Sequence, residues 1–239
     1  MTDHMLHVRQ LFDAHARDWS AKYQPGAPLE ERLARFATPL LSLVPPPAGV
    51  LDLGCGTGNL ASHLASAGYR VRGFEISEAM LEVARQSTSS GEIEWVRLDG
   101  DWRTLPCRSG SCDAVVASSM LEYVDRLAFV ISECARVLRQ GGVLLCTVPD
   151  PTHPIRRAES AFRAAAKGPV SWLRPVWPRR VRAYLDYLQA SKNRLRVEQW
   201  RNLARDAGLE SVPLAESSDS PPPLALLAFR RVSSSGSAA

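Results

Sequence analysis

The stretch from Val50 to Asn59 constrains the fold most, because three glycines stand at alternate positions directly after an apolar run. This pattern predicts a strand, a tight turn and a helix that begins near Leu60. Glycine accepts positive φ angles and lets a ligand lie against bare backbone, and the free N–H groups of the helix point at the same place. The stretch therefore indicates a ligand-binding turn, although a glycine-rich turn without a ligand has the same pattern.

The carboxylate of Asp52 narrows the kind of ligand. A dinucleotide-binding turn has its third glycine one position later, and it normally has an apolar residue where Asp52 stands. A carboxylate at this position would repel a pyrophosphate and attract an ammonium group. The turn therefore suits a ligand with a cationic amine near the loop and a carboxylate near the helix end, such as the methionine part of S-adenosylmethionine.

Several stretches, at the right distances from one another, resemble the motifs of class I S-adenosylmethionine-dependent methyltransferases. Residues 50–59 resemble the first motif, and residues 70–77 resemble the second strand with its terminal acid. Residues 98–106 resemble the "gD…LP" motif, residues 112–117 the "FD-V" strand, and residues 133–142 the "E-RVL-GG" segment. As a set they resemble most the methyltransferases of quinone and secondary-metabolite pathways.

The expected fold class is α/β. Strands and helices alternate along the middle of the chain, which predicts a parallel sheet with right-handed crossovers. The resemblance implies a Rossmann-like, seven-stranded, mostly parallel doubly wound sheet. The predicted strands of its first part are residues 49–53, 70–75, 93–98, 113–118 and 142–148, and the predicted helices are residues 59–67, 78–87 and 124–139.

The chain is expected to divide into five parts. They are an N-terminal helical arm (1–44), an S-adenosylmethionine-binding core (45–150), an inserted substrate lid (151–196), a C-terminal helix and β-hairpin that complete the sheet (197–232), and a disordered tail of small polar residues (233–239). In the arm, Phe12, His15, Trp19 and Tyr23 are spaced to share one helix face.

Composition indicates a globular protein, with 45% hydrophobic and 23% charged residues. No apolar run approaches the ~20 residues of a membrane span, and the first ten residues have no apolar signal core. The five cysteines are scattered and lack zinc spacing. We therefore expect reduced cysteines, a cytoplasmic location and no metal site.

Positive charge is concentrated after residue 150. Residues 151–205 hold 13 arginines and lysines and three acids, although the whole chain has a net charge of only +4. This segment is either a solvated basic face or a lid, with aromatic side chains lining a pocket and arginines contacting an acidic acceptor or an anionic surface. A small, acidic or amphipathic acceptor fits the lid. Nucleic acid does not fit, because no Asn-Pro-Pro-Tyr-type motif follows the fourth strand.

Most site residues follow from the resemblance. Glu75 would accept the ribose hydroxyls of the cofactor or cap the next helix, and Asp101, with Asp99 as its rival, would accept the adenine amino group. The full set of predicted cofactor-binding residues is Tyr23, Asp52, Gly54, Cys55, Gly56, Gly58, Glu75, Ile76, Met80, Asp101, Trp102 and Ser118.

The predicted reaction is methyl transfer to a hydroxyl oxygen of a small or medium organic acceptor. An in-line displacement needs alignment first and a base second. Related enzymes have a histidine where Tyr123 stands here, which leaves His153 and His15 as candidate bases beside that tyrosine. N- or C-methylation of a small molecule is the first alternative, and a non-catalytic cofactor-binding partner of another enzyme is the second.

Overall fold

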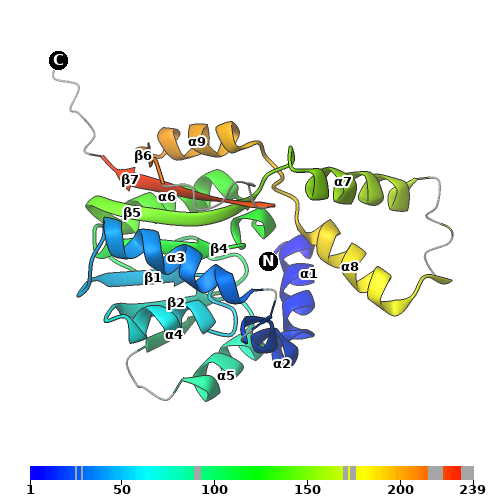
Figure 1. The fold of residues 1–239 in the computed structure, drawn as a ribbon, viewed down its shortest axis with the longest axis horizontal. Coiled ribbons are helices and arrows are strands. Elements are labelled where there is room, and N and C mark those ends of the chain that lie inside the picture. The colour runs from blue at the N-terminus through cyan, green and yellow to red at the C-terminus, as the bar shows by residue number, and fades with distance from the viewer. Residues whose placement is uncertain are drawn as a thin grey trace.

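The computed structural model describes residues 1–24, 26–27, 29–88, 93–168, 172, 176–214 and 223–232. The predicted tail (233–239) and Arg174 lie outside the described residues. Seven described strands form one sheet in the order β3-β2-β1-β4-β5-β7-β6 (Figure 1). The strands are β1 Gly49–Leu53, β2 Arg70–Glu75, β3 Ile93–Arg97, β4 Cys112–Ser118, β5 Leu138–Pro149, β6 Leu209–Val212 and β7 Leu224–Arg231.

The neighbouring pairs from β3 to β5 are parallel, and β7 pairs antiparallel with both β5 and β6. This arrangement confirms the predicted fold class. One difference is that β5 begins at Leu138 rather than at residue 142, because Leu138 pairs with Cys112 across a register shift at the start of β4. The helix before it ends correspondingly early.

The helices alternate with the strands along most of the chain. They are α1 Asp3–Asp13, α2 Ala16–Trp19, α3 Glu30–Leu43, α4 Asn59–Ser66, α5 Glu78–Ser87, α6 Leu127–Val137, α7 Pro154–Lys167, α8 Arg179–Ala190 and α9 Val197–Asp206, with 3₁₀ turns η1 Ser20–Tyr23 and η2 Leu121–Tyr123.

Helices cover both faces of the sheet. Because side chains alternate along a strand, Val50 packs with the buried residues of α3 and α4, whereas Leu51 packs on the opposite face with those of α6 and α9. Phe36 and Trp200 are among the largest fully buried side chains of the two faces. A parallel sheet that is apolar on both faces requires this coverage.

The strand order reverses at β1, which lies between β2 and β4. Ligands of doubly wound sheets bind beyond the carboxyl ends of the strands at such a reversal. Gly54 follows β1 directly, and Glu75 and Ser118 are the last residues of β2 and β4. The topology therefore brings together residues that are as far as 64 positions apart in the chain.

The N-terminal arm is not one continuous helix. It turns after Asp13 and resumes at Ala16, so the predicted single face breaks between Phe12 and Trp19. Helix α1 packs against α5 and α8 (Figure 1). The hydroxyl of Ser77, at the start of α5, donates a hydrogen bond of 2.5 Å to the carboxylate of Asp13. This contact fixes the arm beside the carboxyl edge of the sheet.

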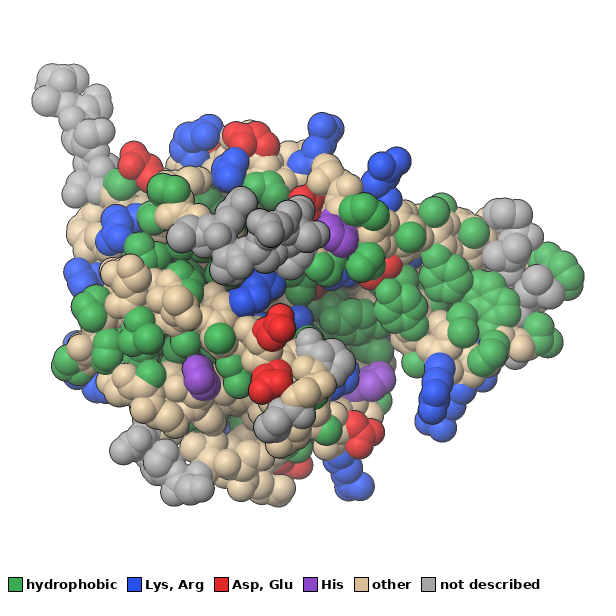
Figure 2. Space-filling view, in the orientation of Figure 1, with side chains coloured by type: hydrophobic (Ala, Val, Ile, Leu, Met, Phe, Trp, Pro, Cys, Tyr) green, Lys and Arg blue, Asp and Glu red, His purple; other side chains and the backbone are tan. Residues whose placement is uncertain are grey.

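Helices α7 and α8 project from the body of the molecule, as Figure 1 shows. Hydrophobic side chains gather on the surface of this projection, which we call the α7–α8 arm (Figure 2). Trp172 and Val176, between the two helices, are 75% and 77% exposed. Phe162 instead stacks on Trp177, with ring centroids 5.7 Å apart. The predicted lid is therefore an arm that points outward over most of its length.

Candidate functional site

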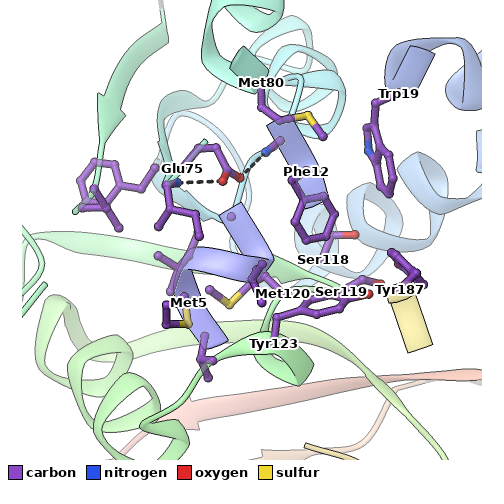
Figure 3. A pocket seen from close by; sticks show the side chains of 18 of the residues that line it. Met5, Phe12, Trp19, Glu75, Met80, Ser118, Ser119, Met120, Tyr123 and Tyr187 are labelled. Atoms are coloured by element: carbon purple, nitrogen blue, oxygen red, sulfur yellow. Dashed lines mark hydrogen bonds between the residues drawn. The ribbon is translucent and has the colours of Figure 1, made fainter. Parts of the chain in front are cut away.

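An open cavity of about 800 Å³ lies at the carboxyl edge of the sheet. Figure 3 shows its walls, which come from the N-terminal arm, the loops after β1, β2 and β4, and helix α8. Most of the predicted cofactor-binding residues line it. They are Tyr23, Gly54, Gly56, Glu75, Ile76, Met80, Trp102 and Ser118.

Four predicted residues do not line the cavity. Cys55 and Gly58 are buried beside it, and a Cβ atom on Gly58 would lie 2.5 Å from the Trp95 ring, so this glycine serves packing. Asp101 is 65% exposed and pairs with the N-terminal amine of Met1 at 2.9 Å. Asp52 is the fourth, one residue inside the end of β1.

Glu75 binds the glycine loop to the start of α5. Its Oε1 accepts hydrogen bonds from the backbone N–H groups of Ile76 (2.7 Å) and Ser77 (3.0 Å), and its Oε2 accepts one from Gly56 (3.0 Å). Burial raises the pKa of this carboxyl, and the three donors oppose that shift. A carboxylate has about four acceptor positions, so the capping role leaves room for about one bond to a ligand.

Asp52 is 1% exposed, and neither of its carboxylate oxygens has a well-formed hydrogen bond to a described residue. Burial, and next the charge of Glu75, raise the pKa of Asp52 to about 7. The Ser118 hydroxyl at the end of β4 is likewise buried and without a partner among the described residues. A buried polar group without a partner is costly, so both groups are suited to a polar ligand.

Arg32 of α3 also lines the cavity, and sequence reasoning missed it. Burial raises the pKa of the neighbouring Tyr23 phenol, the charge of Arg32 opposes this shift, and the nearby Asp52 carboxylate adds to it. A cation and a phenol thus line the cavity, and the buried carboxylate of Asp52 lies close to them. They match the carboxylate and ammonium groups of an amino acid such as the methionine part of S-adenosylmethionine.

Part of the cavity wall is aromatic. Tyr123 of η2 is 3% exposed and makes edge-to-face contacts with Phe12 and Tyr187, with centroids 5.3 and 5.7 Å apart. Burial raises the pKa of Tyr123 well above 10 and that of Tyr187 to about 12. Both phenols are therefore neutral near pH 7 and act as wall and hydrogen-bonding groups there rather than as bases.

The two candidate histidines lie elsewhere. The Nδ1 atom of His15 donates to the Leu11 carbonyl at 2.7 Å, in the turn that ends α1. His153 caps α7, where its Nδ1 accepts a hydrogen bond from the Ile155 backbone at 3.2 Å. Neither imidazole is among the residues that line the cavity.

Comparison with known proteins agrees with this geometry. A family model described as a methyltransferase domain matches residues 51–146. The chain is 30% identical over 169 residues to a ubiquinone biosynthesis O-methyltransferase of Thiobacillus denitrificans, which is 69% of this chain and 66% of that protein, or about two thirds of its length. The chain belongs to the class I S-adenosylmethionine-dependent methyltransferases.

A second sequence relative and a solved structure agree with this family. A ubiquinone biosynthesis O-methyltransferase of Xanthomonas axonopodis pv. citri is 28% identical over 211 residues, 81% of this chain and 85% of that one. The magnesium protoporphyrin IX methyltransferase of Synechocystis PCC 6803, solved with bound S-adenosylmethionine, superposes with a TM-score of 0.65 over 97% of this chain and 98% of that chain, at 19% identity. The second likeness concerns the fold.

Two further properties bear on the chemistry of the methyltransferase. Within the described part of the chain, His, Cys, Asp and Glu side chains form no group of three or more that could hold a metal ion. Among the same residues, no helix has the length and hydrophobicity needed to cross a membrane.

Replacing Glu75 with alanine is expected to weaken S-adenosylmethionine binding by about 1.5–3 kcal/mol for a lost charged hydrogen bond. It should also lower the melting temperature of the cofactor-free protein, because three buried N–H groups lose their acceptor. Calorimetric titration and thermal melts of the variant separate the two effects. Glu78→Ala, which removes a nearby acid in the first turn of α5, outside the cavity lining, is the control. An unchanged affinity in a folded Glu75→Ala variant would exclude ribose binding by this residue.

Proposed function

We propose that this methyltransferase transfers a methyl group to a hydroxyl oxygen of a small aromatic acceptor. The observation that carries the proposal is the shared cavity, which polar groups at the glycine loop and the aromatic side chains of Phe12, Tyr123 and Tyr187 line together. Planar rings stack favourably edge-to-face against such a wall. An acceptor ring held there would lie in the same space as the cofactor.

When bound, S-adenosylmethionine supplies an electrophilic methyl group on a sulfonium. We assign Asp52 to its ammonium group, Arg32 and Tyr23 to its carboxylate, and the remaining acceptor position of Glu75 to its ribose. Ile76, Met80 and Trp102, which line the cavity, would enclose the adenine. Asp101 is better placed to hold the N-terminus, where the structure has it paired.

Positioning is the main contribution of the protein to this reaction. Well-oriented reactants can gain roughly 7–11 kcal/mol from alignment and avoided solvent reorganisation. No histidine is among the lining residues, and the lining phenols hold their protons at neutral pH. The acceptor therefore fits best as a phenol, whose own pKa is low enough for its proton to pass to water.

The ubiquinone biosynthesis O-methyltransferases among the relatives support oxygen as the methylated atom. An amine or carbon acceptor would occupy the same wall, and a non-catalytic partner would bind cofactor without turnover. We expect a panel of phenols, amines and carbon acids, incubated with methyl-labelled cofactor, to give label on a phenol oxygen. Label on nitrogen or carbon would change the reaction class, and no S-adenosylhomocysteine with any acceptor would favour the non-catalytic partner.

We also propose that the α7–α8 arm rests on an anionic lipid surface. Ile155, Trp172 and Val176 expose 54%, 75% and 77% of their surface on the arm. Exposed arginines accompany them at Arg157, Arg179, Arg180 and Arg182. By contrast, Arg156 and Arg194 pair with the buried Glu159, so they support the base of the arm. Apolar side chains flanked by arginines are typical of helices that lie at a membrane interface.

Flotation with vesicles that contain phosphatidylglycerol tests this arm. At ~1 kcal/mol for each basic residue near an anionic surface, the double variant Arg179→Ala/Arg180→Ala should bind about 30-fold more weakly. Trp172→Ala should weaken binding as well. Arg201→Ala/Arg205→Ala, which removes the same charge from exposed positions on α9, should leave flotation unchanged. No flotation of the parent protein, or equal losses in both double variants, would reject the proposal.

A further inference from the structure

Two cysteines meet at the base of the loop that joins β3 to β4. Cys107 is half-buried within the loop, and Cys112, the first residue of β4, is buried. Both are free thiols and are close enough to shift each other's pKa, and the Cys112 sulfur lies 3.9 Å from the Ser111 hydroxyl of the connecting loop. The connecting residues 108–111 are exposed, so a small molecule can approach the pair from solvent.

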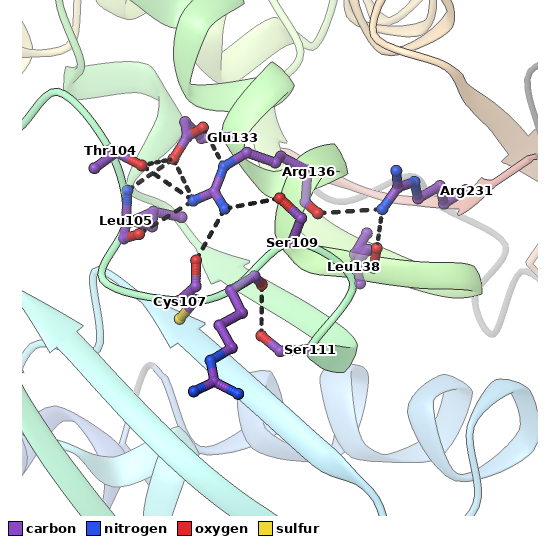
Figure 4. A network of polar contacts seen from close by, with 10 residues as sticks. Thr104, Leu105, Cys107, Ser109, Ser111, Glu133, Arg136, Leu138 and Arg231 are labelled. Carbon is purple, nitrogen blue, oxygen red and sulfur yellow. Dashed lines mark hydrogen bonds and ion pairs between the residues drawn. The ribbon is translucent and has the colours of Figure 1, made fainter.

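Arginines surround this pair. The Arg72 side chain donates from Nη1 to the Cys107 sulfur at 3.1 Å, and Arg136 donates from Nη1 to the Cys107 carbonyl at 2.9 Å. Figure 4 shows Cys107 within the Arg136 network, which also holds Ser109 and Thr104. The neighbouring Cys107 thiol, with the hydroxyl of Ser111 and the charge of Arg72, lowers the pKa of Cys112 to about 7 against the effect of burial. The pair therefore loses its first proton near neutral pH.

The other described cysteines have different surroundings. Cys134 and Cys146 are both fully buried in the core, and burial raises the pKa of Cys134 and raises that of Cys146 to about 12. Burial also raises the pKa of Cys55. Thiolates rather than thiols react with oxidants, so the arrangement distinguishes Cys107 and Cys112 from the remaining three.

We propose that Cys107 and Cys112 are a redox-sensitive pair that a hydroperoxide converts into an intramolecular disulfide. One thiolate attacks the outer peroxide oxygen, the O–O bond breaks, and an alcohol or water leaves. The resulting sulfenic acid is attacked by the second sulfur, the S–O bond breaks, and water leaves as the S–S bond forms. The two sulfurs give up two electrons in total, and the peroxide takes them.

The pair is placed to affect the loop rather than the fold. Trp102, which lines the cavity, belongs to the same loop five residues before Cys107. Glu133 holds the intervening part by accepting from the Leu105 backbone N–H at 2.7 Å and from the Thr104 hydroxyl at 3.0 Å. The disulfide would tie the far end of this loop to β4.

Intact mass spectrometry of the full-length reduced protein after treatment with hydrogen peroxide tests the proposal. We expect loss of the mass of two hydrogen atoms, reversal by dithiothreitol, and a Cys107–Cys112 cross-link in peptide maps. Cys107→Ser should abolish the loss, as should Cys112→Ala. The matched control Cys134→Ala, which removes a fully buried thiol of the core, should behave like the parent protein.

The rate provides a second, independent readout. Arg72→Gln removes the cation beside the sulfurs, so the pKa of Cys112 should rise by about one unit and less of the thiol should be ionised. The more basic thiolate is also a stronger nucleophile, which partly offsets this loss. Oxidation should therefore slow about threefold. Oxygen addition at a single cysteine, a cross-link to another cysteine, a disulfide between molecules, or no change in mass at all would each overturn the proposal. None of these readouts depends on methyl transfer.

Discussion

Replacing Gly56 with valine is expected to abolish S-adenosylmethionine binding while leaving the fold intact. Gly56 lines the cavity with φ +55°, and a Cβ atom there would meet only the Trp19 Nε1 atom within 4 Å, at 3.9 Å. The protein therefore has space for the side chain, but that space is the cavity itself. The backbone strain of a branched residue in this region costs about 1–3 kcal/mol.

Gly110→Val is the matched control for this substitution. Gly110 also has a positive φ, +69°, and a Cβ atom there would approach Arg139 no closer than 3.9 Å. It lies in the exposed loop before β4, outside the cavity residues. Both variants should lose similar thermal stability, and only Gly56→Val should lose binding by calorimetry. Binding and turnover by a folded Gly56→Val protein would show that the loop does not contact the cofactor.

Replacing Asp52 with asparagine is expected to weaken cofactor binding by about 1.5–3 kcal/mol, or about 10- to 150-fold, because a charged acceptor is lost. The same change should remove a pH-dependent instability of the cofactor-free protein. The pKa of Asp52 is about 7 in the folded state instead of 3.8. Between these values the folded protein keeps a proton that the unfolded chain has released, so stability falls as pH rises through this window.

The size of this loss of stability follows from the pKa shift of Asp52. At 1.36 kcal/mol for each pKa unit, the folded protein loses up to about 4 kcal/mol from Asp52 between pH 4 and pH 8. Chemical denaturation of the parent and of Asp52→Asn at several pH values measures the difference, in which the other groups cancel. Parallel pH profiles for the two proteins would contradict a raised pKa at this residue.

Local patterns were sufficient for the core of the fold and for half of the site. The glycine loop, the acid that ends β2 and the alternation of strands and helices along the chain each depend on residues within one βα unit. There, turn chemistry and apolar periodicity act over a few positions. Gly54, Gly56 and Glu75 consequently lie at the predicted edge of the sheet. Their roles toward the cofactor stay predictions that the binding experiments will test.

Features of the site that depend on packing between distant segments were not predictable from the sequence. Arg32 looks like any charged residue on an amphipathic helix, and it enters the cavity only because α3 packs against α4, the helix that follows the glycine loop. Tyr187 reaches the cavity from α8, while Trp172 on the same predicted lid points to solvent. The direction of the α7–α8 arm determines which of these aromatic residues becomes wall and which becomes surface.

The sequence by itself therefore determined the family, the sheet and the position of the cofactor loop, because each is written in short motifs. The tertiary structure alone decided the unpartnered burial of Asp52, the aromatic wall around Tyr123, the absence of His153 and His15 from the residues that line the cavity, and the proximity of Cys107 to Cys112. These depend on long-range packing, in which burial and neighbouring charges set the chemistry of a side chain independently of its position in the chain.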